Sequence, residues 1–178
     1  MESEVRLCVD RLWNGEEALA TERAEVRFAL GAAGLRIGIK AGFHGDPPPL
    51  LPPGRCDGLW HHEVVELFLV NQAGGYLELE FGPHGHYLGL RFAGVRQRQD
   101  PEPAVTFRAA ITGAGWQGWA EVPLASLPPG LTRANAYAIH GQGAGRRYLA
   151  AYPVPGIRPD FHQPQRFRPW ATVAEERP

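Results

Sequence analysis

The sequence has little of what marks several specialised classes of protein. Two cysteines in 178 residues, Cys8 and Cys56, are too few for a disulfide framework. No apolar run approaches the roughly 20 residues of a transmembrane helix, and residues 1–20 lack the regions of a signal peptide. The net charge of −1 shows no basic surplus for nucleic acid or acidic lipid. We therefore expect a cytoplasmic protein that binds neither nucleic acid nor membrane.

Long helical patterns are also scarce, whereas turn-forming residues are abundant. The chain has 22 glycines and 17 prolines, which favours many turns and short strands. From about residue 24, apolar and polar residues alternate with the period of a β-strand. A short helix is expected at 14–23 and a long surface loop at 44–58. The expected strands are 25–30, 35–43, 61–70, 76–82, 86–92, 104–111, 115–122, 136–140 and 146–152.

Strands in hairpin order, with no βαβ alternation and no phosphate-binding loop after a strand, predict an all-β protein. The expected fold is a jelly-roll-like, two-sheet antiparallel β-sandwich of nine to ten strands. Residues 1–178 are expected to form one domain. Within it, residues 153–178 carry several prolines and are expected to form an extended C-terminal strap.

The registers of the central hairpins predict which side chains share a face. Pairing 70 with 76 places Glu66 opposite Glu80, and a turn that pairs 82 with 85 places Glu80 opposite Tyr87. The face expected to be core carries Val65, Leu67, Leu69, Leu77, Leu79, Phe81, Leu88 and Leu90. The other face is expected to carry His62, Glu66, Phe68, Tyr76, Glu78, Glu80, Tyr87 and Arg91.

That second face is unusual because like charges directly opposite each other destabilise a sheet. One interpretation is a shallow binding face, with carboxylates as hydrogen-bond acceptors, Arg91 as a donor and aromatic rings as flat contacts. The alternative is a face that is solvated or covered by arginines. The pairing of 111 with 116 places Trp119 opposite Arg108. This tryptophan either stacks on a sugar ring or takes Arg108 as a cation–π partner.

Catalytic and metal-binding alternatives remain open. Glu78 and Glu80 lie two apart on one strand, about 6–7 Å between carboxyls, which overlaps the spacing of an inverting glycoside hydrolase. The turn pair His84 and His86 offers two metal ligands without further ligands nearby in the sequence. No cofactor is expected, and calcium is the ion to test. The tail offers a third alternative, in which Phe161, Phe167 and Trp170 bind a protein partner.

Two stretches resemble a known family. Residues Leu59-Trp60-His61-His62-Glu63-Val64-Val65-Glu66-Leu67-Phe68 and Tyr76-Leu77-Glu78-Leu79-Glu80-Phe81-Gly82-Pro83-His84-Gly85 are similar to DOMON-like domains, in the branch related to family 9 carbohydrate-binding modules. Ala138-Ile139-His140-Gly141, Tyr152-Pro153-Val154-Pro155 and Pro159-Asp160-Phe161-His162 look closer still to an uncharacterised family of bacteria and animals. We expect a bacterial member of that family.

The resemblance implies a jelly-roll-like β-sandwich that binds a sugar. Family 9 modules clamp a sugar between two tryptophans, for which Trp60 and Trp119 are the candidates here. The expected function is therefore a non-catalytic module for a carbohydrate or other small polar ligand. A glycan-acting enzyme with Glu66 and Glu80 as acid and base is the alternative. The expected ligand-binding residues are Trp60, His62, Glu66, Glu78, Glu80, Tyr87, Arg91, Arg108, Trp119 and His140.

Overall fold

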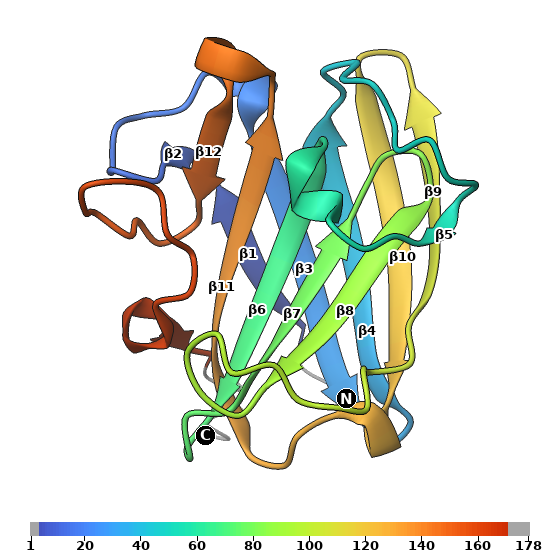
Figure 1. The fold of residues 1–178 in the computed structure, drawn as a ribbon, viewed down its shortest axis with the longest axis vertical. Helices are drawn as coiled ribbons and strands as arrows, with labels where there is room; N and C mark the ends of the chain where they lie inside the picture. The colour runs from blue at the N-terminus through green and yellow to red at the C-terminus, as the bar shows by residue number, and fades with distance from the viewer. Residues whose placement is uncertain (1–3, 171–178) are drawn as a thin grey trace, which may run out of the picture.

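The computed structural model describes residues 4–170 and shows two β-sheets packed face to face (Figure 1). The rear sheet in Figure 1 has five strands in the order β1-β3-β4-β10-β9. Their bounds are β1 Val5–Val9, β3 Ala24–Gly31, β4 Gly34–Gly42, β9 Thr106–Thr112 and β10 Gly115–Pro123. The hairpin of β3 and β4 pairs Leu30 with Leu35, as predicted.

The front sheet has eight strands, in the order β2-β12-β11-β6-β7-β8-β5, with β13 paired to β11. Their bounds are β2 Arg11–Leu12, β5 Gly54–Arg55, β6 Val64–Asn71, β7 Tyr76–Phe81, β8 His86–Phe92, β11 Leu131–His140, β12 Arg147–Ala150 and β13 Arg168–Pro169. The predicted two-sheet β-sandwich is confirmed. One short pair departs from it, because β5 runs parallel to β8.

Helical structure is limited to single 3-10 turns in the described part of the chain. They are η1 Ala20–Glu22, η2 Leu59–His61, η3 Leu124–Ser126, η4 Gly143–Gly145 and η5 Pro164–Arg166. The helix expected at 14–23 is thus reduced to η1. Within residues 4–170, no helix is long and apolar enough to cross a membrane.

A strand that the sequence analysis missed closes one edge of the rear sheet. β1 pairs with β3, placing Val5, Leu7 and Val9 opposite Phe28, Val26 and Ala24. Leu7 and Val9 are buried. Leu7 and Val9 alternate with polar or exposed neighbours, which is the strand pattern that identifies β1 in the sequence.

The main core lies between the two sheets and follows the predicted alternation along β6 and β7. Leu67, Leu69, Leu77 and Leu79 are fully buried there. From the rear sheet, Phe28 and Trp116 pack into the same cluster. Burial of large side chains at about 25 cal/mol per Å² is the main contribution to the stability of such a sandwich.

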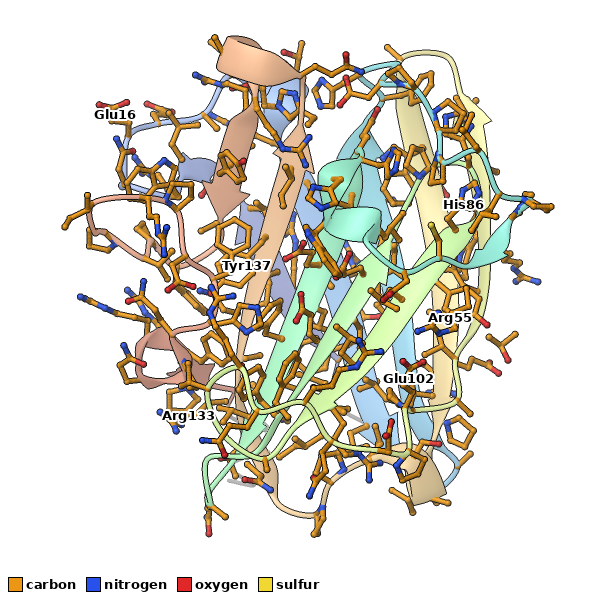
Figure 2. The ribbon with its side chains drawn as sticks, in the orientation of Figure 1. Glu16, Arg55, His86, Glu102, Arg133 and Tyr137 are labelled. Carbon is orange, nitrogen blue, oxygen red and sulfur yellow. The ribbon has the colours of Figure 1, made fainter. Side chains whose placement is uncertain are left out.

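The outer face of the front sheet carries a second core, and the chain from Pro153 to Trp170 (the tail segment) covers its β12–β11 side (Figure 1). The ring of Phe161 stacks at 3.9 Å on that of Tyr137, which is labelled in Figure 2 on the outer side of the front sheet, and Phe167 packs edge-on against Phe68. Arg133 of β11 donates a hydrogen bond to the carbonyl of Pro164. The expected strap is therefore an integral layer over residues 153–170, and the expected part at 171–178 lies outside the described residues.

The predicted register of β8 is wrong by one residue. The expected turn is present, since the Gly85 N–H donates to the Gly82 carbonyl, but Gly85 has φ of 86° and extends the loop by one residue. This is the pattern of a three-residue hairpin loop, a type I turn followed by a left-handed glycine. The ladder therefore starts at Gly82 and His86, and Glu80 faces Leu88 instead of Tyr87.

The one-residue shift exchanges the two faces of β8. Leu88 and Leu90 belong to the outer core, in the same cluster as Cys56 and Leu59. Tyr87 packs against the core between the sheets. Arg91 lies on that same inner side and donates a hydrogen bond to the carbonyl of Ser126 at 2.5 Å.

Truncating an aromatic side chain of the tail segment should destabilise the whole domain. Phe167→Ala removes a ring that is 3% exposed and should cost about 3–5 kcal/mol of unfolding free energy. Ile157→Ala is the matched control, because Ile157 lies in the same segment and is fully exposed; its cost should stay within about 0.5 kcal/mol. Urea denaturation measures both, and equal small effects would mean that the tail segment is not part of the core.

Candidate functional site

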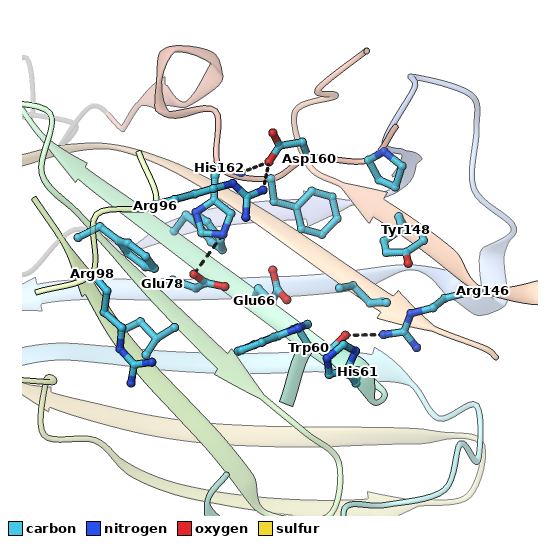
Figure 3. Close-up of a pocket in the computed structure, with 16 residues that line it drawn as sticks. Trp60, His61, Glu66, Glu78, Arg96, Arg98, Arg146, Tyr148, Asp160 and His162 are labelled. Atoms are coloured by element: carbon cyan, nitrogen blue, oxygen red, sulfur yellow. Dashed lines mark hydrogen bonds and ion pairs between the residues drawn. The ribbon is translucent and has the colours of Figure 1, made fainter. Parts of the chain in front are cut away.

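The tail segment does not cover the outer face completely, and a pocket of about 520 Å³ remains beside it (Figure 3). We call it the central pocket. Its walls are mainly aromatic and apolar, and its rim is charged. The lining residues are Trp60, His61, Glu66, Phe68, Glu78, Leu90, Phe92, Arg96, Arg98, Ile139, Arg146, Tyr148, Pro159, Asp160, Phe161 and His162.

Three glutamates lie together at the base of the central pocket, of which Glu66 and Glu78 line it and Glu80 lies beneath them. Glu66 on β6 is directly opposite Glu80 on β7, as predicted, and Glu78 is two residues away on the same face. All three are buried, with exposures of 2%, 5% and 0% for Glu66, Glu78 and Glu80. One oxygen from each lies within 4.8 Å of the others. We call Glu66, Glu78 and Glu80 the carboxylate cluster.

Burial dominates the protonation of this cluster. Loss of hydration raises the pKa of Glu78 to about 7. It raises the pKa of Glu66 and of Glu80 well above the ordinary value, and the nearby carboxyls raise both further. Among the described residues, no group outside the cluster donates a hydrogen bond to Oε2 of Glu78 or to either oxygen of Glu80, and the side chains of Glu78 and Glu80 lie close enough to share a proton. The protein thus holds acceptor groups without partners outside the cluster at the base of the central pocket.

A hydrogen-bonded chain joins the 93–102 loop to the tail segment beside the cluster. The backbone N–H of Arg96 donates to the Tyr76 hydroxyl at 3.0 Å, and that hydroxyl lies 2.7 Å from Nδ1 of His162. Nε2 lies 3.6 Å from Oε2 of Glu78. Burial lowers the pKa of His162 to about 4, so the ring is neutral at pH 7.

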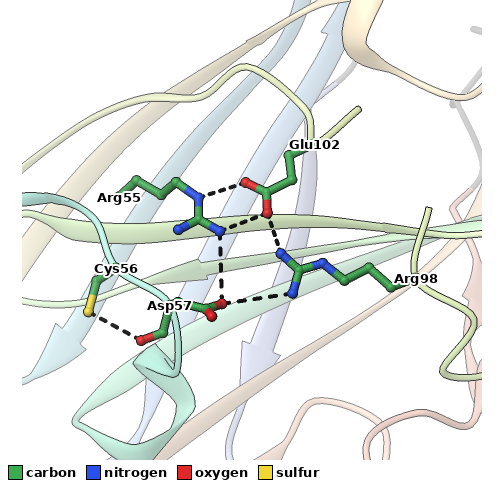
Figure 4. Close-up of polar contacts among 5 residues, drawn as sticks. All are labelled: Arg55, Cys56, Asp57, Arg98 and Glu102. Atoms are coloured by element: carbon green, nitrogen blue, oxygen red, sulfur yellow. Dashed lines mark hydrogen bonds and ion pairs between the residues drawn. The ribbon is translucent and has the colours of Figure 1, made fainter. Parts of the chain in front are cut away.

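Two arginines at the rim are held by carboxylates of their own. Arg96, whose φ of 57° is rare for a residue other than glycine, pairs with Asp160 of the tail segment at 2.7 Å. Arg98 pairs with Glu102, which also receives two hydrogen bonds from Arg55 (Figure 4). These ion pairs fix the 93–102 loop over the end of the pocket.

A third arginine closes the opposite side. Arg146 donates to the carbonyls of Trp60 at 2.5 Å and of Gly141 at 3.0 Å. It thereby ties η2, which carries Trp60, to the loop that follows β11. Its guanidinium also lies near the Tyr148 ring, at 5.7 Å from the centroid. Trp60 is left 38% exposed on the pocket wall.

The structure brings together four of the ten residues expected to bind a ligand. Trp60, Glu66 and Glu78 line the central pocket, and Glu80 lies next to the two glutamates. Tyr87 and Arg91 were placed on this face by the incorrect register and instead point between the sheets.

The other four lie elsewhere. Trp119 faces Arg108 on the rear sheet, and the guanidinium lies 5.4 Å from the centroid of the indole ring. Of the two alternatives for Trp119, the structure therefore shows the cation–π contact with Arg108. The expected clamp of Trp60 and Trp119 is therefore not formed.

His62 and His140 contact neighbours outside the central pocket. Nδ1 of His62 lies 3.2 Å from the Pro47 carbonyl. His140 stacks on His44 at 3.6 Å, and its Nε2 lies 3.2 Å from Glu22. The possible metal ligand His86 instead contacts the Leu51 carbonyl through Nε2 at 2.8 Å.

The sequence analysis assigned no role to most of the rim. Arg96, Arg98 and Arg146 come from loops, and Asp160 and His162 from the tail segment. The motif Pro159-Asp160-Phe161-His162 had carried the family resemblance. Its position on the pocket follows from the docking of the tail segment, which no local pattern reveals.

Comparison with known proteins places the chain in a family. It is 37% identical to the UPF0462 protein C4orf33 homolog of Mus musculus, over 92% of this chain and 89% of the mouse protein. It is 38% identical to the human UPF0462 protein C4orf33, over 86% and 81%. The chain belongs to the UPF0462 C4orf33 family. These relatives are animal proteins, which is at odds with the expectation of a bacterial protein.

Searches with family models and solved structures add a fold relationship. No family model matches the chain. A candidate carbohydrate-binding protein from Bacteroides uniformis aligns with a TM-score of 0.69, over 93% of this chain and 84% of that one, at 17% identity. A family 9 carbohydrate-binding module from Caldicellulosiruptor kristjanssonii, in complex with cellotriose, aligns with a TM-score of 0.49 at 12% identity, too loosely to support an argument. The first likeness shows a shared fold.

The carboxylate cluster predicts a loss of stability as pH rises. The folded-state pKa of Glu78 is above its ordinary value, so its contribution to stability is complete below about pH 4.5 and is lost as pH rises through about 7. In the presence of a chelator, unfolding free energy should fall between about pH 5 and 8. In Glu78→Gln, this decrease of the unfolding free energy with pH should be smaller by up to about 3 kcal/mol.

Urea denaturation at intervals of one pH unit measures this effect. The control is Glu16→Gln, which changes an exposed carboxyl far from the cluster and should leave the pH dependence of the parent protein intact. A wild-type stability that rises over this pH range would contradict the raised pKa of Glu78.

Proposed function

We propose that this protein binds a small polyhydroxylated ligand, most simply a mono- or oligosaccharide, in the central pocket. The observation that carries the proposal is that Glu66 and Glu78 line a partly aromatic pocket and that Oε2 of Glu78 has no hydrogen-bond partner among the described residues. A sugar hydroxyl is a donor that would satisfy this oxygen. A pocket of about 520 Å³ is within the usual range for small-molecule sites.

The wall chemistry supports the same class of ligand. Trp60 offers a partly exposed indole on one side, and Tyr148 and Phe92 are among the other aromatic residues of the wall. Flat aromatic surfaces pack well against the apolar faces of sugar rings, and the polar groups then fix orientation. The solved structure with the shared fold comes from a candidate carbohydrate-binding protein, which is compatible with this proposal.

A glycan-acting enzyme is the second candidate, favoured by the pKa of about 7 at Glu78 beside the pocket. A general acid with such a pKa suits catalysis near neutral pH. The carboxyl spacing argues against the inverting mechanism, since oxygens within 4.8 Å of each other are closer than the roughly 6.5–9.5 Å of inverting enzymes. Glu80, with no exposed surface, is also poorly placed to attack a substrate. Release of nitrophenol from aryl glycosides would favour this candidate.

Binding can be tested by calorimetric titration with a panel of mono- and oligosaccharides, once with chelator and once with added calcium. Trp60→Ala should weaken binding at least about tenfold, because a stacking surface is lost. Trp119→Ala is the matched control: its indole is similarly exposed, 42% against 38%, but lies on the other sheet. That variant should bind as the parent does.

Two outcomes would overturn the proposal. One is the absence of binding by every sugar under both conditions. The other is equal weakening by Trp60→Ala and Trp119→Ala, which would place any bound sugar outside the central pocket.

A further inference from the structure

Among the described residues, no arginine or lysine forms an ion pair with the carboxylate cluster. The basic side chain in direct contact with it is His162, at 3.6 Å from Glu78, and this ring is part of the hydrogen-bonded chain to Tyr76 and Arg96. The neighbouring guanidiniums are committed elsewhere: Arg96 to Asp160, and Arg98 to Glu102. Arg146 is directed to backbone carbonyls.

Glu80 provides an observation that is independent of the clustering. Its side chain has no exposed surface, and both carboxylate oxygens are buried without a hydrogen-bond partner outside the cluster among the described residues. A buried carboxylate with neither partner nor counter-ion is costly, and natural proteins pair such groups or use them to coordinate metals. The side chain lies on the same sheet face as Glu66 and Glu78 and is directed at them.

The spacing of the oxygens fits a bound cation. Oxygen ligands of Ca²⁺ lie at 2.3–2.6 Å, so two on opposite sides of the ion are roughly 4.6–5.2 Å apart and adjacent ones are closer. One oxygen from each glutamate lies within 4.8 Å of the other two. Hard divalent cations prefer carboxylate oxygens, and the cluster contains no sulfur or imidazole ligand that would favour zinc or copper.

We propose that Glu66, Glu78 and Glu80 bind one hard divalent cation of the calcium or magnesium class at the floor of the central pocket. The cation neutralises most of the charge of the three carboxylates and occupies their free oxygens. Since Glu66 and Glu78 line the pocket, one side of the ion faces the pocket and remains available for water or a bound hydroxyl. Cation binding itself does not depend on what organic ligand the pocket takes.

Binding of the metal alone tests the proposal. Chelator-treated, dialysed protein is titrated with Ca²⁺, Mg²⁺ and Mn²⁺ by calorimetry, and with Tb³⁺ by tryptophan-sensitised luminescence. We expect one ion per chain for at least one of the divalent cations. Trp60→Phe should reduce the sensitised Tb³⁺ emission while leaving the calorimetric affinity unchanged, because Trp60 lines the same pocket.

The ligand assignment is tested by substitutions that keep side-chain shape. Glu80→Gln and Glu78→Gln should each weaken the affinity at least about tenfold, since affinity at such sites depends on the number of charged ligands. The matched control is Glu63→Gln, another carboxyl that is 5% exposed but whose oxygens accept backbone N–H bonds from His44 and Asp46. That variant should bind the ion as the parent does.

The proposal is overturned if the folded parent binds none of these cations at millimolar concentration, or if Glu80→Gln and Glu78→Gln bind as tightly as Glu63→Gln. Circular dichroism confirms that each variant is folded before titration. Because no sugar is present, a negative result here is separate from a negative result in the saccharide titrations.

Discussion

The arrangement of the site depends on one contact, the packing of the tail segment on the outer face of the front sheet. Antiparallel sheets usually leave one face to solvent, but here Phe161 stacks on Tyr137 and Phe167 packs on Phe68. Strands β6 and β7 are consequently buried on both faces. The same layer forms one wall of the central pocket and, together with η2 and the 93–102 loop, covers glutamates that an uncovered sheet would have left hydrated.

The buried glutamates are a local cost that the two cores offset. Like charges opposite each other weaken a β-ladder, and burial disfavours ionisation, yet Glu66 and Glu80 sit opposite each other at the centre of the sheet. Leu67 and Leu79 occupy the adjacent pair and are fully buried on the other face. A sheet held this firmly tolerates an unfavourable polar pair, and such tolerated groups are concentrated at functional sites.

Local pattern was sufficient for the parts of the site that lie on neighbouring strands. Alternation and hairpin pairing correctly placed Glu66 opposite Glu80 and Trp119 opposite Arg108. The prediction for β8 was wrong because Gly85 has a positive φ and adds one residue to the hairpin loop. The resulting one-residue shift in register places Tyr87 and Arg91 on the other face of the sheet. The rim residues Arg96, Asp160 and His162 could not have been placed, because their positions depend on contacts between segments more than 60 residues apart in sequence.

The separation of Trp60 from Trp119 changes what a sugar would meet in this protein. A clamp of two tryptophans recognises both faces of a ring and leaves its edges to solvent, whereas here one indole faces a pocket with a carboxylate floor. Recognition would then depend on hydroxyls reaching the floor, so that the pattern of hydroxyl groups matters more than flat apolar area. Because buried acceptors are left unpaired by a ligand that lacks the matching donor, such a pocket discriminates between stereoisomers more strongly than an open aromatic platform does.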